Sequence, residues 1–233
     1  SALANEFNSM TDRLRETEER RRRFVSDASH ELKTPLASIR LLSDSIMQTE
    51  NMDTATMREF VSDIGAEAER LQRTTEKLLT LTRLDSSVEP QLEPVDLKLA
   101  AENTMRLLRP LAQEHRIFLK YDLSEGCVVL ANGDDMYQII FNLVENGIKY
   151  NTPDGMVHLH LGVRDGMVRL VVEDSGIGIP ESDMPHVFDR FYRVDKARSR
   201  EHGGSGLGLS IVHDAVVGCG GTIEVMPNEP RGT

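Results

Sequence analysis

The sequence predicts a chain of two parts, an all-α helical hairpin followed by an α+β sandwich in which helices cover one mixed sheet. Over residues 3–85, apolar side chains recur at spacings of three and four, the period of amphipathic helices. Beyond residue 95, helical patterns are interspersed with stretches of alternating apolar and polar residues, which are typical of strands. A length of 233 residues is sufficient for two domains, although one is possible.

The first helix is expected over residues 3–50, which hold almost no helix breaker before Pro35. His30 points away from the apolar face of this helix, and Thr34 lies close to it on the same exposed side. Pro35 has no backbone N–H, which leaves the carbonyl of Glu31 free and predicts a kink. Such a histidine is usually just a solvated side chain, but its setting makes it a candidate reactive centre. The apolar face consists of Phe24, Ala28, Leu32, Ile39, Leu42 and Ile46.

A second helix is expected from a break near Asp53, with Asp53 or Thr54 as N-cap, to about Asp85. Two long helices joined by a short turn favour an antiparallel hairpin, and one hairpin cannot bury two apolar stripes well. We therefore predict a homodimer in which two hairpins form a four-helix bundle; packing of the hairpin against the second part is the alternative. The heptad seam consists of Met57, Ile64, Leu71 and Leu78, flanked by Val61, Ala68, Thr75 and Leu81.

Ser86–Pro94 is expected to be a linker because it contains two serines and two prolines. The turn residues Asp165 and Gly166 between two alternating stretches predict a β-hairpin. The predicted elements are a helix after Asp96 containing Leu97–Leu111, strands Phe118–Leu123 and Cys127–Leu130, a helix from Asp134 or Asp135 to Lys149, strands Met156–Arg164 and Met167–Asp174, a loop-rich stretch 176–204, a helix Leu207–Gly218 and a strand Thr222–Met226.

Composition excludes some classes of function. The formal net charge of -11 argues against a general nucleic-acid binder. Cys127 and Cys219 show neither metal-ligand spacing nor a disulfide framework. No apolar run approaches 18 residues and the first residues do not resemble a signal peptide, so we expect this chain to be soluble.

Two stretches of the second part suggest a ligand. Asn142, Asn146 and Lys149 share one helix face, where amide oxygens suit Mg²⁺, although a polar outer face would look the same. Asp174 follows an apolar strand and can accept a hydrogen bond from an exocyclic amine. Gly176 and Gly178 let the backbone approach a flat ring, although an ordinary Asp-Gly turn is the simpler alternative.

A third stretch, Gly203–Leu209, is rich in glycine and immediately precedes a helix, so its backbone N–H groups can bind a phosphate. It is not a Walker loop, because no Gly-Lys-Ser/Thr follows. It follows a loop rather than a strand, which excludes a dinucleotide fingerprint, and it does not match a nucleophile elbow. By itself this motif is a weak signal.

Together, and in this order, these motifs closely resemble the cytoplasmic part of a bacterial two-component sensor histidine kinase. His30–Leu36 resembles the H box of that family and Asn142–Asn151 its N box. Asp174–Gly178 resembles the G1 box, Phe188–Phe191 the F box and Gly204–Gly208 the G2 box. The resemblance implies a protein-histidine kinase with a helical hairpin and an ATP-binding sandwich of the Bergerat (GHKL) type.

The resemblance also implies domain limits. Residues 1–20 would be the end of a HAMP signalling helix, and residues 21–88 the dimerisation and histidine-phosphotransfer domain. Residues 89–95 would be the linker, and residues 96–233 the catalytic ATP-binding domain. The family usually continues into one more strand after Thr233, and a sheet edge is expected to be exposed if that strand is absent. Gly147 departs from the alanine common in the family, at a cost of roughly 1 kcal/mol in helix propensity.

The same resemblance implies the roles of residues. His30 would attack the γ-phosphate of ATP, Glu31 would accept its proton or orient its ring, and Thr34 would orient water for dephosphorylation of a response regulator. Arg193 would offset charge on the transferred group. The nucleotide and metal residues would be Asn142 and Asn146 for Mg²⁺, Lys149 and Tyr150 for phosphate or nucleotide, Asp174 with Gly176 and Gly178 for adenine, and Gly204, Gly206, Leu207 and Gly208 around the phosphates.

The implied partners are a second copy of the chain and a cognate response regulator, with no nucleic acid. In the full-length protein, segments outside this chain would anchor it in the cell membrane, with this region facing the cytoplasm. A catalytically silent dimeric scaffold and a GHKL-type ATPase clamp are the alternatives. The scaffold would lack part of the nucleotide site, and the clamp would not need the stretch around His30.

Overall fold

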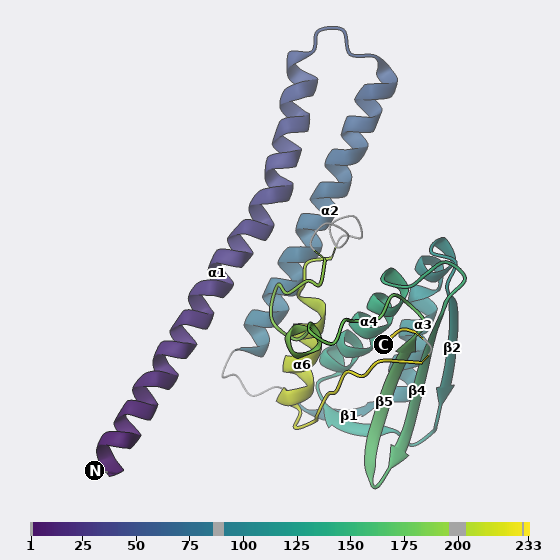
Figure 1. Ribbon diagram of the computed structural model, residues 1–233. Helices are drawn as coiled ribbons and strands as arrows, with labels where there is room; N and C mark the ends of the chain where they lie inside the picture. Colours follow the sequence, from purple (N-terminus) through teal and green to yellow (C-terminus); the bar gives the residue numbers. More distant parts are fainter. Residues whose placement is uncertain (1, 86–90, 196–203, 230) are drawn as a thin grey trace. The chain divides into compact units, whose positions relative to one another are not determined.

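The computed structural model describes residues 2–85, 91–195, 204–229 and 231–233 (Figure 1). The chain forms two compact units, Ser1–Leu79 and Thr80–Thr233, and each is a separate body with its own architecture. None of the helices in the described ranges is both long enough and apolar enough to cross a membrane.

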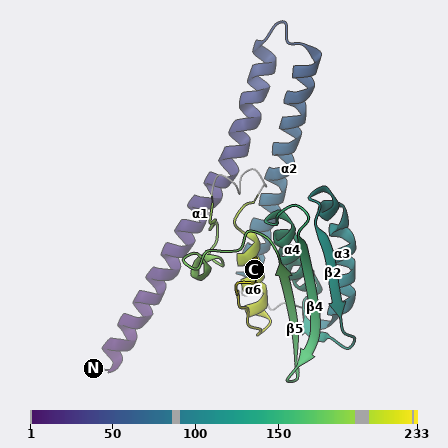
Figure 2. The same cartoon turned by 45° about the vertical axis from the view of Figure 1, so that its right-hand side comes forward.

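The first unit is an antiparallel helical hairpin, as predicted (Figures 1 and 2). It consists of α1 (Ala2–Gln48) and α2 (Thr54–Leu84), of which the last turn of α2 belongs to the second unit. Asp53 caps α2, because its Oδ1 atom accepts hydrogen bonds from the backbone N–H groups of Ala55 and Thr56, both at 2.9 Å.

The buried face of α1 is the predicted one. All six apolar residues of that face are half-buried, and Pro35 beside them is fully buried. His30 and Thr34 are exposed. The helix continues through Pro35, and the kink there stays a prediction.

The seam of α2 is only partly covered within the hairpin. Ile64, Leu71 and Leu78 are half-buried, whereas Met57 and Val61 are 41% and 57% exposed. Both helices therefore keep large apolar side chains on their surface. The exposed large apolar residues of residues 25–79 are Val25, Leu36, Leu41, Met47, Met57, Val61 and Leu79.

The second unit contains the predicted mixed sheet. Its strands are β2 (Phe118–Leu123), β4 (Met156–Arg164) and β5 (Met167–Asp174), in the order β2-β4-β5. β2 is parallel to β4, and β4 is antiparallel to β5. The predicted hairpin turn is present, because Asp165 and Gly166 both have positive φ angles, 53° and 78°.

A second, two-stranded antiparallel sheet pairs β1 (Glu93–Asp96) with β3 (Val128–Ala131). β1 occupies a stretch that we expected to be linker. The two prolines suggested a break, but a proline is compatible with a short edge strand. Residues 86–90 of the expected linker lie outside the described residues.

Helices cover one face of the three-stranded sheet (Figures 1 and 2). They are α3 (Leu97–Glu114), α4 (Gly133–Lys149) and α6 (Gly208–Gly218); a 3₁₀ turn, η1 (Met184–His186), lies in the loop-rich stretch. Asp96 caps α3 as predicted. The cap of α4 is Asn132, two or three residues before the predicted aspartates. The core between these layers contains Ala101, Met105, Leu108, Ile140, Val144, Ile148, Val157 and Leu159.

Gly147 has a packing reason to be glycine. A Cβ atom at this position of α4 would lie 3.1 Å from Cγ2 of Val157 in β4. The missing side chain therefore lets the helix lie close to the sheet, which offsets its low helix propensity.

The predicted strand Thr222–Met226 is wrong, because this stretch has no regular secondary structure. Its residues alternate as in a strand, but a strand also needs a neighbour that supplies backbone hydrogen bonds. Near the end of the edge strand β5, the Asp174 N–H instead donates to the carbonyl of Thr233 at 2.9 Å.

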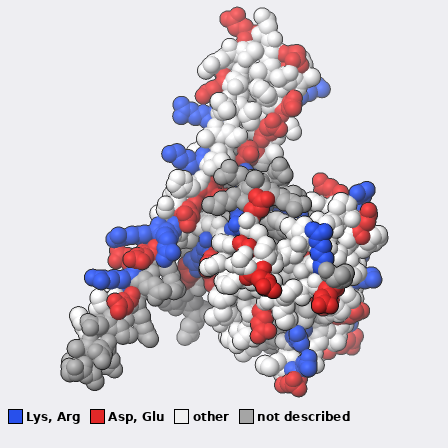
Figure 3. Space-filling view, viewed as in Figure 1, with Lys and Arg blue, Asp and Glu red and all other residues white. Residues whose placement is uncertain are grey.

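Figure 3 shows acidic and basic side chains interspersed over one face of the chain.

Candidate functional site

A buried amide on α4 forms the centre of the site. Asn142 is 1% exposed, and its Nδ2 atom donates to the backbone carbonyl of Gln138 at 2.8 Å and to the Gln138 side chain at 3.2 Å. These bonds fix the amide so that its Oδ1 atom has no hydrogen-bond partner among the described residues. A buried polar atom without a partner costs about 1–3 kcal/mol, so the atom is poised for a ligand.

The start of α6 faces this amide. A Cβ atom at Gly208 would lie 3.1 Å from Asn142 Oδ1 and 3.7 Å from Asn146 Nδ2. No side chain caps α6, and the buried Oγ atom of Ser205 also has no hydrogen-bond partner in the described part of the chain. Uncapped N–H groups at a helix start attract anions, so an edge suited to an anion lies beside two amide side chains.

Lys149 ends the predicted polar face, but its Nζ atom lies 2.8 Å from Oε1 of Glu145. Both side chains are largely covered, with 19% and 12% exposed. Sequence reasoning missed Glu145, although its place four residues before a lysine on the same helix is a visible signal. In this structure the ammonium is therefore held by a carboxylate.

Asp174 ends β5 and is anchored by the turn that follows it. Its Oδ1 atom accepts a hydrogen bond from the backbone N–H of Gly176 at 2.8 Å. Burial raises the pKa of the Asp174 carboxyl, and backbone hydrogen bonds from Gly176 and Thr233 oppose this effect. A half-buried carboxylate held in one orientation can select a hydrogen-bond donor.

Gly176 has no room for a side chain. A Cβ atom there would lie 2.5 Å from the carbonyl oxygen of Tyr150, which also accepts the Ile177 N–H at 3.1 Å. Gly178 has a φ of +71°, a conformation that favours glycine. Tyr150 is the C-cap of α4, so these contacts lock the Asp174 turn onto the end of that helix.

The last residues of the chain pack against the same turn. Asn228 donates through Nδ2 to the backbone carbonyl of Asp174 at 2.9 Å. A Cβ atom at Gly232 would lie 1.9 Å from that carbonyl oxygen. Sequence reasoning assigned no role to either residue, and no local pattern announces a contact between positions 54 apart.

The segment Phe188–Phe191 holds the glycine-rich stretch. The Phe191 N–H donates to the carbonyl of Gly206 at 2.9 Å, and a Cβ atom at Gly206 would lie 2.8 Å from the Phe191 carbonyl carbon. Gly206 also has a φ of +70°. Arg193, shortly after this segment, is half-buried. Residues 196–203 of the predicted loop-rich stretch lie outside the described residues.

Arg190 is the main electrostatic anchor of this segment. Its Nη1 and Nη2 atoms each donate to the Asp85 carboxylate at 2.7 Å, and Nη2 also lies 2.7 Å from Oδ2 of Asp214 on α6. The bonds to Asp85 and Asp214 raise the pKa of Arg190 further above its usual range. The glycine-rich stretch and the start of α6 are thereby tied to the end of α2 within the second unit.

The remaining predicted residues are placed as follows. On α1, Glu31 is half-buried, and Thr34 donates through Oγ1 to the carbonyl of His30 at 3.1 Å. Gly204 is half-buried, whereas Leu207 is fully buried, so the Leu207 side chain belongs to the core. The structure brings two groups of predicted residues together in the second unit. The first group consists of Asn142, Asn146 and the start of α6. The second consists of Tyr150, Asp174 and Gly176. His30, Glu31 and Thr34 form a separate group in the first unit.

Two protein-family models match the chain. Residues 20–87 match the His Kinase A (phospho-acceptor) domain. Residues 131–233 match the histidine kinase-, DNA gyrase B- and HSP90-like ATPase.

Curated relatives point in the same direction. The chain is 37% identical over 227 residues to the sensor histidine kinase YkoH of Bacillus subtilis, covering 97% of this chain and 49% of that protein. It is 33% identical over 233 residues to the signal transduction histidine-protein kinase ArlS of Staphylococcus aureus, covering 99% of this chain and 51% of that protein. The chain thus spans about half the length of the relatives it matches.

Solved structures share the fold. The mycobacterial sensor histidine kinase MprB aligns with a TM-score of 0.53 at 29% identity, covering 60% of this chain and 91% of that one. Full-length ShkA in complex with AMPPNP aligns with a TM-score of 0.65 at 26% identity, covering 88% of this chain and 42% of that one. ThkA in complex with the response regulator TrrA gives a TM-score of 0.70 at 20% identity, covering 94% and 63%. With its phospho-acceptor and ATPase domains, the chain belongs to the sensor histidine kinases of bacterial two-component systems.

Proposed function

We propose that this chain autophosphorylates His30 from ATP and transfers the phosphoryl group to an aspartate of a response regulator. The observation that carries the proposal is the buried Oδ1 atom of Asn142, without a partner among the described residues and facing the uncapped start of α6 at Gly208. An amide oxygen beside the uncapped N–H groups of a helix start suits a metal-bound triphosphate better than a purely apolar ligand.

The donor set fits Mg²⁺ with ATP as the substrate. Asn142 and Asn146 would supply hard amide oxygens to the ion, which neutralises phosphate charge when bound. Gly204, Gly206 and Gly208 would line the phosphates with backbone N–H groups. A larger set completes the nucleotide site: Lys149, Tyr150, the backbone of Leu207, and Asp174 with Gly176 and Gly178 for the adenine.

The residues of the hairpin supply the acceptor. A neutral nitrogen of His30 attacks the γ-phosphorus, a nitrogen–phosphorus bond forms, and the bond to the oxygen of ADP breaks. Glu31 accepts the imidazole proton or orients the ring. Arg193 offsets charge on the transferred phosphoryl group. Thr34 acts in dephosphorylation of the response regulator, where it orients a water molecule toward the phosphorylated aspartate. The protein would then be a phosphatase as well.

Exposed apolar stripes support a homodimer. Val25, Leu36 and Met47 lie eleven positions apart on α1, which places them on one face because eleven residues make about three helical turns. Their side chains are 57%, 57% and 82% exposed. A second hairpin would cover these stripes in a four-helix bundle.

The response regulator and the membrane are further parts of the proposal. The similar ThkA was crystallised with its response regulator TrrA, which supports docking of a regulator on this chain, although that likeness is one of fold. Because the matched sensor kinases are about twice as long, we place the membrane-spanning segments in the part of the protein outside this chain.

Incubation with γ-labelled ATP and Mg²⁺ tests this function. The label should be acid-labile and alkali-stable, as expected for a nitrogen–phosphorus bond, and chelation of Mg²⁺ should abolish it. Asn142→Ala should lose both label and nucleotide binding, while Asn103→Ala, an exposed amide on α3, should keep both. An acid-stable label, or undiminished labelling of Asn142→Ala, would contradict the proposal.

A further inference from the structure

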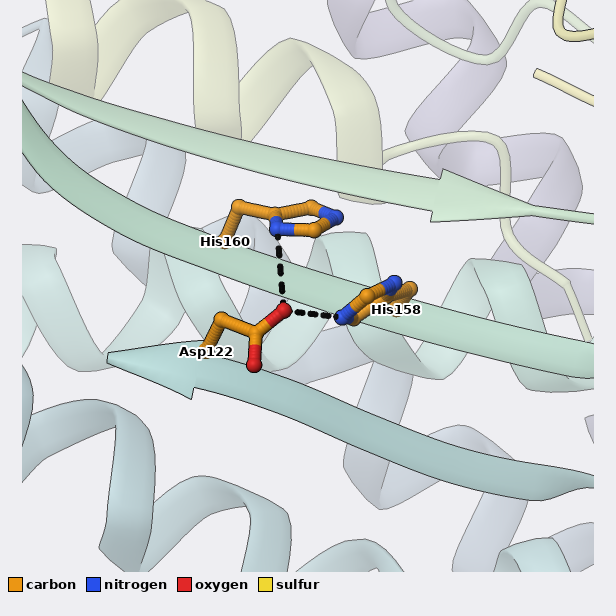
Figure 4. Close-up of side chains that lie close together, drawn as sticks. All are labelled: Asp122, His158 and His160. Carbon is orange, nitrogen blue, oxygen red and sulfur yellow. Dashed lines mark hydrogen bonds and ion pairs between the residues drawn. The ribbon is translucent and has the colours of Figure 1, made fainter.

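The open face of the three-stranded sheet carries a cluster of metal-ligating side chains. Val157 and Leu159 of β4 are fully buried toward the helices, so His158 and His160, which alternate with them, point to the opposite face. Asp122 of β2 is paired in register with His160. Figure 4 shows one carboxylate oxygen of Asp122 directed toward a nitrogen of each imidazole ring.

The three side chains converge on one point. Oδ2 of Asp122 lies 2.8 Å from Nε2 of His158 and 3.5 Å from Nδ1 of His160. These three ligand atoms all lie within 4.8 Å of one another. Ligand atoms around a tetrahedral zinc ion are separated by about 3.3–3.6 Å, given metal–ligand bonds of about 2.0–2.2 Å. Small side-chain rotations would therefore convert this cluster into a coordination site.

A second carboxylate orients one of the imidazoles. Oε2 of Glu173 on β5 lies 3.5 Å from Nε2 of His160, on the other side of the ring from Asp122. A proton held at Nε2 by Glu173 leaves the lone pair of Nδ1 directed toward Asp122 and His158. Metal-binding histidines in proteins are oriented in this way by a carboxylate on the non-ligating nitrogen. Glu173 is thus a positioning residue for this site.

Burial and access also suit a metal ion. The His158 and His160 side chains are 20% and 37% exposed, so the sheet holds them in place, whereas Asp122 is 73% exposed and free to adjust. Asp122, His160 and Glu173 also line a hollow of about 740 Å³ on this face. The hollow gives an ion a path from solvent and leaves room for water to complete its coordination shell.

We propose that His158, His160 and Asp122 bind a divalent transition-metal ion of the zinc, nickel or copper type. Two imidazole nitrogens with one carboxylate oxygen favour these ions, whereas Mg²⁺ prefers oxygen ligands alone. The site is therefore chemically different from the proposed Mg²⁺ site, which uses the amide oxygens of Asn142 and Asn146 on α4. A bound ion would link the parallel strands β2 and β4.

Isothermal titration of the 233-residue chain with ZnCl₂ tests the proposal, after removal of metals by a chelator and with excess Mg²⁺ but no nucleotide. We expect one zinc ion per chain. His158→Ala and His160→Ala should each weaken binding by roughly tenfold or more, and zinc should raise the melting temperature of the unchanged chain. His186→Ala is the matched control, because His186 lies 3.0 Å from Oδ2 of Asp189 and belongs to no metal-ligating cluster among the described residues.

Two further variants separate ligation from folding. Asp122→Asn changes an exposed side chain, so it should keep the fold while weakening zinc binding by roughly tenfold. Glu173→Gln should weaken binding and change the tautomer of His160 seen in ¹⁵N NMR of the imidazoles. Absence of saturable zinc binding, or unchanged affinity in folded Asp122→Asn and His160→Ala, would overturn the proposal.

Discussion

Asn142 and Gly208 lie so close that a Cβ atom at Gly208 would be 3.1 Å from the Oδ1 atom of Asn142. This approach joins α4 to the start of α6 and leaves a buried acceptor beside uncapped backbone N–H groups. We therefore expect the amide and the glycine to form one wall of the proposed nucleotide site. A side chain at Gly208 would have to displace the amide.

Gly208→Ala should weaken nucleotide binding by roughly tenfold or more, because the new methyl group moves Asn142 and covers the helix start. The melting temperature should not fall, since alanine favours a helix over glycine by about 0.5–1 kcal/mol. Titration with ATP and Mg²⁺ measures the affinity.

Gly218→Ala is the matched control, because Gly218 ends the same helix and a Cβ atom there would meet nothing within 4 Å. This variant should bind nucleotide like the unchanged chain. Equal affinity of Gly208→Ala and Gly218→Ala would refute a role for the close approach.

Asp174→Asn should separate stability from binding. Burial raises the pKa of this carboxyl above its ordinary value of 3.8, so the folded chain holds the proton more tightly than the unfolded chain does. Stability conferred by the neutral form is present below that value and is lost as the pH rises through the folded pKa. Asparagine does not ionise, so the variant should melt at an equal or higher temperature at pH 7, with the difference shrinking toward pH 4.

Nucleotide binding should change in the opposite direction. The amide presents a donor as well as an acceptor to adenine, so we expect the affinity of Asp174→Asn for ATP to fall by roughly tenfold or more. A lower melting temperature of the variant at pH 7 would contradict the stability prediction. An unchanged affinity for ATP would contradict the binding prediction.

Arg190→Ala should destabilise the second unit. The substitution leaves Asp85 and Asp214 without their shared guanidinium, at a cost of about 1–3 kcal/mol because all three side chains remain partly exposed. Chemical denaturation measures the free energy of unfolding. Arg164→Ala removes an exposed pair with Asp165 at 3.8 Å and should cost less than about 0.5 kcal/mol. Similar losses in both variants would argue against an anchoring role for Arg190.

Thr34→Ala should slow dephosphorylation of the response regulator by roughly tenfold or more, because we propose that its hydroxyl positions the attacking water. Autophosphorylation should remain within about twofold, since the hydroxyl donates to the His30 backbone carbonyl and not to the imidazole that accepts the phosphoryl group. Ser45→Ala removes an equivalent bond, to the Leu41 carbonyl at 2.9 Å, and should change neither rate. Parallel loss of both activities in Thr34→Ala would reject the division of roles.

Local patterns in the sequence predicted the helices, the mixed sheet and much of the site. Asn142 and Asn146 are four apart, so their shared face follows from helix geometry. A close approach of another group to Gly176 was also predictable. The sequence suggested a ligand ring, whereas in the structure the carbonyl oxygen of Tyr150 occupies the place of a side chain. Periods of two and 3.6 residues suffice for such features.

Contacts between distant positions could not be predicted in this way. Arg190 meets Asp85 across 105 positions, and no residue pattern encodes that pairing. The alternation at Thr222–Met226 was misleading because strand formation depends on a neighbour supplied by the tertiary fold. Likewise, Asp122 meets His158 only through the strand register, 36 positions apart.

Labelling of His30→Gln with γ-labelled ATP tests the central claim most directly, provided that ATP affinity is measured in the same sample. His30 lies in the hairpin and the nucleotide residues lie in the second unit, so the variant should bind ATP with unchanged affinity. His115→Gln serves as the control and should keep both the ATP affinity and the acid-labile label of the unchanged chain. We predict that His30→Gln binds ATP and accepts no acid-labile label. Acid-labile label on His30→Gln at the level of the unchanged chain would contradict the assignment of His30 as the phosphoryl acceptor.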